Sequence, residues 1–296
     1  MGTDEEDEID ESEQDQDEAP ASDDPRTQPL RYSVLKAMKQ SPAHARALAL
    51  RESDGPSLAF RLGAGAHALT FGTPEVVVFN GQRRRSKENA KKPTAWDEFE
   101  KANAGKVIVN AREYAHAKAM ADAIKANEVA RRVLLANDAI REERINWTWN
   151  DRAWRSTPDA RAFRTLAELK TTRCADPAMF WRDALRMSYH VQLAIYRRAV
   201  HQHTGIKPRE VYLFAVESKP PYVVTPFMLT ERSLEHGDRL ASEWHARFLK
   251  CEAENAWPAY TTGIEELDVY DPEDEAALEA ERALAGDDGV RAAVEF

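Results

Sequence analysis

Hydrophobic and polar residues follow two different periods along this chain, and each period predicts one kind of element. A repeat of three to four residues, typical of helices packed on a core, covers residues 32–49, 57–69, 113–136, 176–203 and 233–254. The first of these helices is interrupted at Ser41-Pro42, because proline disrupts a helix interior. Short apolar or alternating runs, typical of strands, cover residues 76–79, 144–149, 162–170, 211–217 and 222–228. Pro220-Pro221 separates the last two runs, which predicts a hairpin there.

The order of these elements predicts an α/β fold, a mixed β-sheet flanked by helices. Strands come first, the helix at 176–203 crosses over, and two more strands follow it. A chain of 296 residues with 43% hydrophobic residues can bury a sizeable core.

Charge is distributed unevenly over the chain, whose net charge is −10. Residues 1–28 carry a net charge of −12 and residues 265–296 one of −10, which leaves +12 on residues 29–264. The first segment has almost no large apolar side chains, so we expect a disordered acidic tail there and a flexible acidic tail at residues 265–296. The basic middle, residues 29–264, is the predicted folded domain, and its charge suits an anionic partner.

Several protein classes are disfavoured by composition. Residues 1–28 contain no apolar segment of the kind found in secretory signals, and no apolar run is long enough to span a membrane. Two cysteines, Cys174 and Cys251, are too few for a disulfide scaffold or for the four ligands of an iron–sulfur cluster. We therefore expect a cytoplasmic protein without such a cluster.

Candidate chemistry appears in the segment STPDARAFRTLAELKTT, residues 156–172. On a strand, Glu168 and Lys170 project from one face, and Asp159 at the end of the preceding turn can approach the same face. Two neighbouring carboxylates repel unless a cation lies between them, and Mg²⁺ prefers such oxygen ligands. A lysine beside the metal can hold a phosphate or a water nucleophile, as phosphodiester hydrolysis requires. The alternative is an ordinary solvent face of a hairpin, which would contain the same residue types.

Two further features favour the chemical interpretation. Gln192 and Tyr196 lie four residues apart, so both face one side of the predicted helix, although a buried tyrosine beside a polar neighbour is common. His67 follows small residues in GAGAH that permit close backbone approach, although a lone histidine is more often structural.

In order, the segments GAGAH, STPD, ELKTT and QLAIY resemble the motifs of the PD-(D/E)XK nuclease superfamily. The chain is most similar to the RecE-type exodeoxyribonucleases of phages and prophages, from SVLKAMKQSPAHA near residue 32 to about residue 260. The resemblance implies a PD-(D/E)XK nuclease-like core and a metal-dependent enzyme that degrades one strand of linear duplex DNA, 5′ to 3′. The single-stranded tails would serve recombination by strand annealing.

Site roles follow from this resemblance residue by residue. The implied ligands of Mg²⁺, or of Mn²⁺ as a substitute, are His67, Asp159, Glu168 and the backbone carbonyl of Leu169. Asp159 and Glu168 are also catalytic in that scheme, together with Lys170, Gln192 and Tyr196. Glu143 matches an acidic position before Asp159, and it remains open whether it is an auxiliary ligand or structural.

A basic loop follows the strand at 76–79 and is a candidate DNA contact. Its members are Arg83, Arg84, Arg85, Lys87, Lys91 and Lys92. A solvated loop that maintains solubility is the alternative. Trp96 and Phe99, three residues apart, are expected to pack in the core rather than stack on bases.

The expected partners are double-stranded DNA ends, a RecT-like single-strand annealing protein and further copies of the chain in a ring, all implied by the resemblance. No membrane association is expected. Two alternatives remain: a DNA-binding or assembly protein with a decayed nuclease fold, and an endonuclease of the same superfamily. The presence of Asp159, Glu168 and Lys170 together favours an active enzyme.

Overall fold

A computed structural model describes residues 28–50, 58–84, 86, 92–261, 263–267, 276 and 279–280. The chain divides into two compact units, Met1–Trp257 and Pro258–Phe296, and the first contains all the elements described below. The predicted acidic tails, residues 1–28 and 265–296, fall almost entirely outside the described residues. No helix among the described residues is long and apolar enough to cross a membrane.

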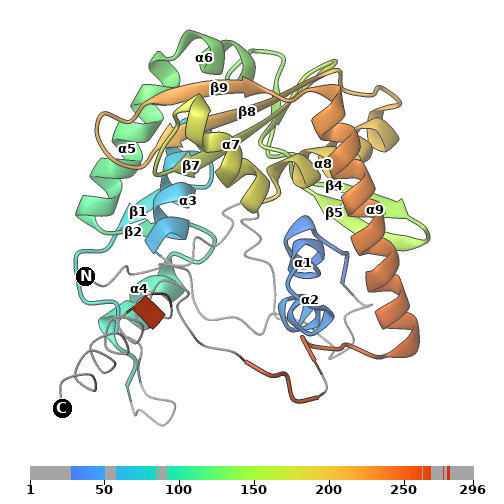
Figure 1. Cartoon of the computed structure of the whole chain (residues 1–296). Helices are drawn as coiled ribbons and strands as arrows, with labels where there is room; N and C mark the ends of the chain where they lie inside the picture. Colours follow the sequence, from blue (N-terminus) through green and yellow to red (C-terminus); the bar gives the residue numbers. More distant parts are fainter. Residues whose placement is uncertain are drawn as a thin grey trace, which may run out of the picture. The chain divides into compact units, whose positions relative to one another are not determined.

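A five-stranded mixed sheet forms the centre of the first unit (Figure 1). Its strands, in spatial order, are β3 (Ile140–Arg141), β6 (Ala160–Arg161), β7 (Thr165–Thr172), β8 (Glu210–Glu217) and β9 (Val224–Met228). β7 and β8 are parallel over their whole length, and every other neighbouring pair is antiparallel. The predicted α/β fold with a mixed sheet is confirmed, as is the hairpin of the last two strands.

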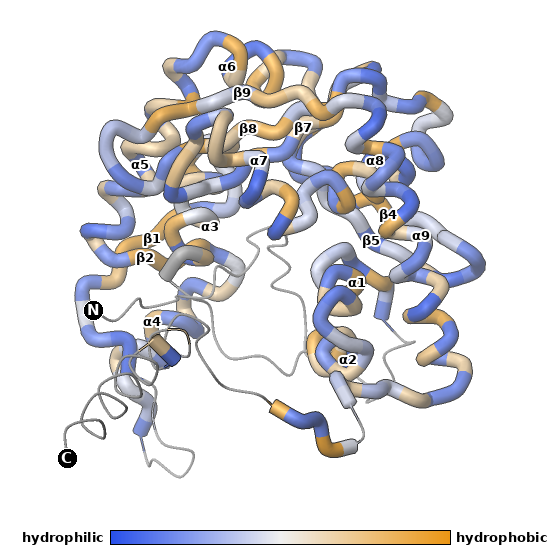
Figure 2. Tube along the Cα trace, viewed as in Figure 1, coloured by the Kyte–Doolittle hydropathy of each residue, from blue (hydrophilic) through white to orange (hydrophobic). Residues whose placement is uncertain are grey.

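Helices cover both faces of this sheet (Figure 1). On one face, α8 (Tyr189–Thr204) and α9 (Glu231–Glu254) pack together, and side chains of α8 share an apolar cluster with β8. On the other face lie α3 (Leu58–Phe71), α5 (Ala111–Ala126) and α6 (Glu128–Leu134), which share a second apolar cluster with β7 and β8. Figure 2 shows hydrophobic residues along β8, whereas hydrophilic and hydrophobic residues alternate along α9.

Side-chain alternation along β7 assigns its residues to the two faces. Leu166 belongs to the apolar cluster on the α8 side, and Ala167 and Leu169 belong to the cluster on the α3 side. Glu168 and Lys170 have the parity of Leu166, so their side chains lie on the α8 side. The expectation that they share one face is therefore met.

Smaller elements surround the sheet. Two parallel strands, β1 (Val76–Val78) and β2 (Val107–Val109), pair with each other, and β4 (Ile145–Trp149) forms an antiparallel hairpin with β5 (Arg152–Ser156). The remaining helices are α1 (Tyr32–Ala37), α2 (Pro42–Ala49), α4 (Ala95–Ala102) and α7 (Pro177–Arg186).

Two of the predicted helices are each divided. The helix expected at 113–136 is two helices, because Asn127 takes extended ψ 119° and its side chain accepts a hydrogen bond from the Ala130 N–H, capping α6. The helix expected at 176–203 is likewise divided, between α7 and α8. Ser188 lies at that break in the left-handed region, with φ 61°. Hydrophobic periodicity continues across both breaks, so it could not reveal them.

The strand predictions at 144–149 and 211–217 match β4 and β8 closely. The strand predicted at 162–170 is displaced, because residues 162–164 form the turn between β6 and β7. β5 was not predicted, because its sequence RAWRS contains two arginines and resembles a loop. It is nonetheless a strand, with Trp154 fully buried against Trp147 and Trp149.

Candidate active site

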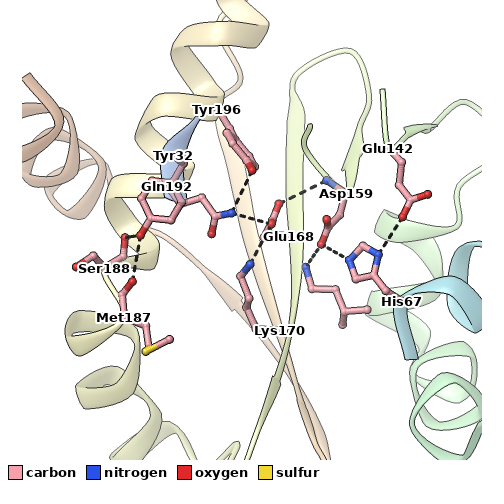
Figure 3. A network of polar contacts seen from close by, with 11 residues as sticks. Tyr32, His67, Glu142, Asp159, Glu168, Lys170, Met187, Ser188, Gln192 and Tyr196 are labelled. Atoms are coloured by element: carbon pink, nitrogen blue, oxygen red, sulfur yellow. Dashed lines mark hydrogen bonds and ion pairs between the residues drawn. The ribbon is translucent and has the colours of Figure 1, made fainter. Parts of the chain in front are cut away.

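The middle of β7 carries a buried ion pair. Lys170 Nζ donates to Glu168 Oε1 at 3.1 Å, and the two side chains are 2% and 1% exposed (Figure 3). Burial of both charged groups rules out the solvent face of a hairpin as their environment. Removing two charged groups from water costs free energy that their mutual attraction does not fully repay. A buried pair on this strand therefore implies a role that compensates the cost.

Asp159 is locked against the same strand from the end of the turn before β6. Its Oδ2 accepts a hydrogen bond of 2.6 Å from the Leu169 N–H, and its own N–H lies 3.4 Å from Glu168 Oε2. These contacts bring the carboxyl groups of Asp159 and Glu168 close together at one edge of β7. The N–H and C=O of a strand residue point to the same side, so the Leu169 carbonyl lies on the same edge of β7 as the N–H that Asp159 accepts from.

His67 approaches Asp159 from α3. Its Nε2 lies 2.8 Å from Asp159 Oδ2, and its Nδ1 lies 3.0 Å from Glu142 Oε1 (Figure 3). The small residues before it act through packing between helices, because a Cβ on Gly65 would lie 2.9 Å from Ala117 Cβ on α5. Gly65 thus lets α3 pack close to α5, and the predicted close backbone approach is an approach to a helix. His67 lies inside α3, which continues to Phe71.

Gln192 and Tyr196 enter from α8 and complete the cluster. Gln192 Nε2 lies 3.2 Å from Glu168 Oε1 and 3.2 Å from Tyr196 Oη, and both side chains are fully buried (Figure 3). Within the described part of the chain, Gln192 Oε1 is buried without a hydrogen-bond partner. A buried acceptor without a donor is unfavourable, so this oxygen is available to a water molecule or a cation.

The electrostatics of the cluster are those of a site with excess negative charge. Burial and the charge of Asp159 raise the pKa of Glu168 to about 8, although Lys170 and His67 act in the opposite direction. Burial alone would lower the pKa of His67, but Asp159 and Glu142 outweigh it and raise that pKa to about 10. In the metal-free protein, the imidazolium therefore supplies the positive charge between two carboxylates.

These residues fit a hard divalent cation. Two carboxylates and one backbone carbonyl, with the imidazole nitrogen of His67 beside them, make a donor set dominated by oxygen, which suits Mg²⁺ and Mn²⁺. Among the described residues, no three His, Cys, Asp or Glu side chains are already arranged around a common metal position. A cation would therefore replace the contact between His67 and Asp159.

The neighbouring acids Glu142 and Glu143 have different surroundings. Glu143 Oε2 accepts a hydrogen bond from Arg161 Nε at 2.6 Å, which supports the structural alternative for this residue. Glu142, which sequence reasoning missed, contacts His67 instead. Its backbone has φ 48°, and this turn geometry, invisible in the sequence, decides which of the two acids faces the site.

Tyr189 is a second residue missed from the sequence. Lys170 Nζ lies 5.3 Å from the centre of its ring, a cation–π distance, and the ring is 7% exposed. A signal was present, because Tyr189, Gln192 and Tyr196 have the i, i+3, i+7 spacing of one helical face.

The basic loop is only partly described. Arg83 is held by Glu113, with nitrogen–oxygen distances of 2.9 and 2.6 Å, so its guanidinium anchors the loop to the N-terminus of α5. Arg84 and Lys92 are exposed and remain candidate DNA contacts. Arg85, Lys87 and Lys91 lie outside the described residues.

Trp96 and Phe99 pack around Phe79 with ring-centre distances of 5.2 and 4.9 Å. Trp96 is buried, as expected of a residue that docks α4. The prediction of a packing role for this pair is confirmed.

Comparisons with known proteins identify a family and a shared fold. The model of a family described as "PDDEXK-like domain of unknown function (DUF3799)" matches residues 32–269. A crystal structure described as a "Putative exonuclease" from Eubacterium rectale superposes with a TM-score of 0.56 and 13% identity, covering 84% of this chain and 94% of that one. The crystal structure of SSO0001 is 16% identical over 51% of this chain and 81% of that one, with a TM-score of 0.26. No curated protein matches the sequence.

Proposed function

Because the chain belongs to the family of PDDEXK-like domains (DUF3799), we propose that it is a metal-dependent deoxyribonuclease. The observation that carries this proposal is the buried cluster of Asp159, Glu168 and Lys170. In it, Lys170 donates to the Glu168 carboxylate, the Asp159 N–H lies beside that carboxylate, and the Asp159 side chain accepts from the neighbouring Leu169 N–H. A structural role alone does not account for three buried charged groups and an unsatisfied amide oxygen beside them.

Asp159, Glu168 and the Leu169 carbonyl would hold Mg²⁺, or Mn²⁺ in its place. The bound metal would neutralise charge on the scissile phosphate and lower the pKa of a bound water. His67 is assigned as a further ligand through Nε2, the nitrogen that faces Asp159. Among the described residues, these four bring the suitable donor atoms to one strand edge.

Lys170 is assigned to the attacking water or to the scissile phosphate. Its ammonium is fixed by Glu168 and by the ring of Tyr189, so it needs no reorganisation when negative charge develops. Gln192 and Tyr196, both on α8, orient Glu168: the Gln192 amide donates to the Glu168 carboxylate and also contacts the Tyr196 hydroxyl. In this scheme, Glu168 both binds the metal and holds the lysine.

The substrate we propose is the end of linear double-stranded DNA, one strand of which is degraded, 5′ to 3′, to leave a single-stranded tail. Support comes from the order of the four sequence motifs, which resembles RecE-type exodeoxyribonucleases, and from the fold shared with the E. rectale protein. The charge of +12 on residues 29–264 suits a polyanion. A RecT-like annealing protein and a ring of identical subunits are the partners consistent with that role.

One cleavage assay tests this function. Linear duplex DNA labelled at either the 5′ or the 3′ end, and closed circular DNA, are incubated with the protein in Mg²⁺ and in EDTA. We expect progressive loss of the 5′ label from linear DNA in Mg²⁺ and no cleavage of circles. Cleavage of circles would identify an endonuclease. Binding without cleavage under all conditions would identify a DNA-binding protein with a decayed site.

A further inference from the structure

Glu142 makes two contacts that meet at the candidate metal site. Its side-chain Oε1 lies 3.0 Å from His67 Nδ1, and its backbone N–H donates to the Asp159 carbonyl at 3.1 Å. One residue therefore links the histidine on α3 to the backbone of the principal carboxylate. Figure 3 shows the imidazole lying between Glu142 and Asp159.

The backbone of Glu142 is in an unfavourable conformation. Its φ of 48° lies in the left-handed region, which residues with a Cβ seldom occupy. Glycine would adopt this conformation without strain. Because glycine would fit this backbone better, a glutamate here points to a role for its side chain. The side chain is 21% exposed, and the contact it makes is with His67.

The two ring nitrogens of His67 have different partners, and this determines how the ring can act. A histidine that gives one nitrogen to a metal retains a single proton on the other nitrogen. Glu142 is an acceptor at Nδ1, so it holds a proton there, and Nε2, which lies 2.8 Å from Asp159 Oδ2, becomes the coordinating nitrogen when a cation takes the place of its proton. Carboxylates that accept this proton from metal-bound histidines orient the ring and increase its basicity.

We propose that Glu142 is a positioning residue that fixes the ring orientation and tautomer of His67 for metal coordination through Nε2. This inference rests on the proposed metal-dependent function, and it concerns how tightly the site binds its cation. Glu143 provides a matched comparison one residue away, because its carboxylate is directed to Arg161.

The test measures metal binding directly. Mn²⁺ is titrated into the full chain by calorimetry for wild type, Glu142→Gly, Glu142→Gln and Glu143→Gln, and circular dichroism gives each melting temperature. Glu142→Gly should weaken Mn²⁺ binding roughly 10- to 100-fold, as expected for loss of such a partner. Its melting temperature should stay near the wild-type value, because glycine relieves the left-handed backbone. Glu142→Gln keeps an oxygen acceptor and should recover part of the affinity, whereas Glu143→Gln should bind as wild type does.

Nitrogen-15 NMR of the histidine ring in saturating Mg²⁺ supplies a second measurement. Wild type should show the proton of His67 on Nδ1, and Glu142→Gly should lose that preference. Wild-type affinity in both Glu142 variants, with metal still bound, would overturn the inference while leaving the proposed function intact. If the wild-type chain binds neither Mn²⁺ nor Mg²⁺, both fail.

Discussion

The ammonium of Lys170 lies 3.1 Å from Glu168 Oε1, and the two residues are neighbours on one face of a single strand. Residues i and i+2 on a strand are close enough for such a contact, so no long-range packing is needed to pair these charges. What the tertiary fold adds is burial, together with Gln192 and Asp159 around the same carboxylate.

Replacing Lys170 by alanine should abolish cleavage while leaving DNA binding nearly unchanged. The lysine is one of many positive charges for binding, but within the described cluster it is the one placed to stabilise charge at the reacting phosphate. We expect single-turnover cleavage to fall by about 10²-fold or more. Binding to blunt duplex is measured by fluorescence anisotropy in EDTA. Lys118→Ala, which removes an exposed lysine on α5, is the control. Comparable cleavage by the two variants would exclude Lys170 from the reaction.

Glu168→Gln should inactivate the enzyme and remove part of the pH dependence of stability in EDTA. The folded-state pKa of Glu168 is raised to about 8 from 4.5, so its ionised form is disfavoured in the fold. A raised pKa means stability that is fully present below pH 4.5 and is lost as pH rises toward 8. The neutral amide avoids that loss. Between pH 6 and pH 8 in EDTA, the melting temperature of wild type should fall relative to that of the variant, by about 2 to 4 °C for a change of about 1 kcal/mol. Parallel pH profiles of the two melting temperatures, with a wild-type cleavage rate in the variant, would contradict both expectations.

The contribution of His245 on α9 to stability should be lost as pH falls from about 6.5 to 4, whereas the raised pKa of Glu168 acts in the opposite direction over part of this range. The His245 side chain is fully buried, accepts a hydrogen bond from Trp154 Nε1 at 3.3 Å and packs at a tilt against the ring of Trp149. Burial, helped by the charges of Arg198 and Arg152, lowers its pKa to about 4. The unfolded chain binds the proton first, so stability decreases as pH falls through this window, by up to about 3 kcal/mol.

Urea unfolding of wild type and His245→Gln at pH 7.5, 6 and 5 measures this contribution. The pKa of His190 is also lowered to about 4, mainly by burial, so the variant should lose only part of the pH dependence. Identical pH profiles for the two proteins would assign the effect to other groups.

Tyr32→Phe should slow cleavage, because the Tyr32 hydroxyl holds the start of α8 in place. The Tyr32 hydroxyl lies 2.9 Å from the Ser188 carbonyl and 3.1 Å from the Met187 carbonyl, at the left-handed residue that precedes Gln192 on its helix. Loss of these bonds should cost about 1 kcal/mol of stability. Because Gln192 is oriented by this helix, we also expect a reduced cleavage rate.

The second variant for this prediction is Ser188→Gly, which lets the backbone adopt its left-handed conformation without strain. If Tyr32 acts by holding this break, Tyr32→Phe combined with Ser188→Gly should recover part of the stability. Thermal melts and single-turnover rates are compared for the two single variants and the double variant. Strict additivity in both measurements would argue against coupling.

The sequence was most informative where the spacing of residues along an element alone decides which face of the element a side chain occupies. Glu168 and Lys170 share a face because they are two apart on a strand, and Gln192 and Tyr196 do because they are four apart on a helix. The choice between Glu142 and Glu143 could not be made this way. It depends on one left-handed φ in a turn, for which the pair of adjacent glutamates carries no signal.

Helix breaks were similarly inaccessible. Asn127 and Ser188 interrupt runs whose apolar periodicity continues on both sides, because each half packs on the same sheet. The ion pair of Arg83 with Glu113 was also hidden, since the two residues are thirty positions apart and only the fold brings them together. Local sequence patterns thus predicted the elements and motifs, whereas the conformation of turns and the pairing of residues distant in the sequence depend on the tertiary fold.

The parallel pairing of β7 with β8 has a consequence for biosynthesis. Parallel neighbours need a crossover, so β7 cannot gain this partner until α7, α8 and all of β8, ending at Glu217, have been synthesised. The strand that carries Glu168 and Lys170 therefore stays incomplete on a growing chain whose first 170 residues have already emerged. The cluster around Glu168 thus acquires its geometry late in translation, only after Glu217 has been added to the chain.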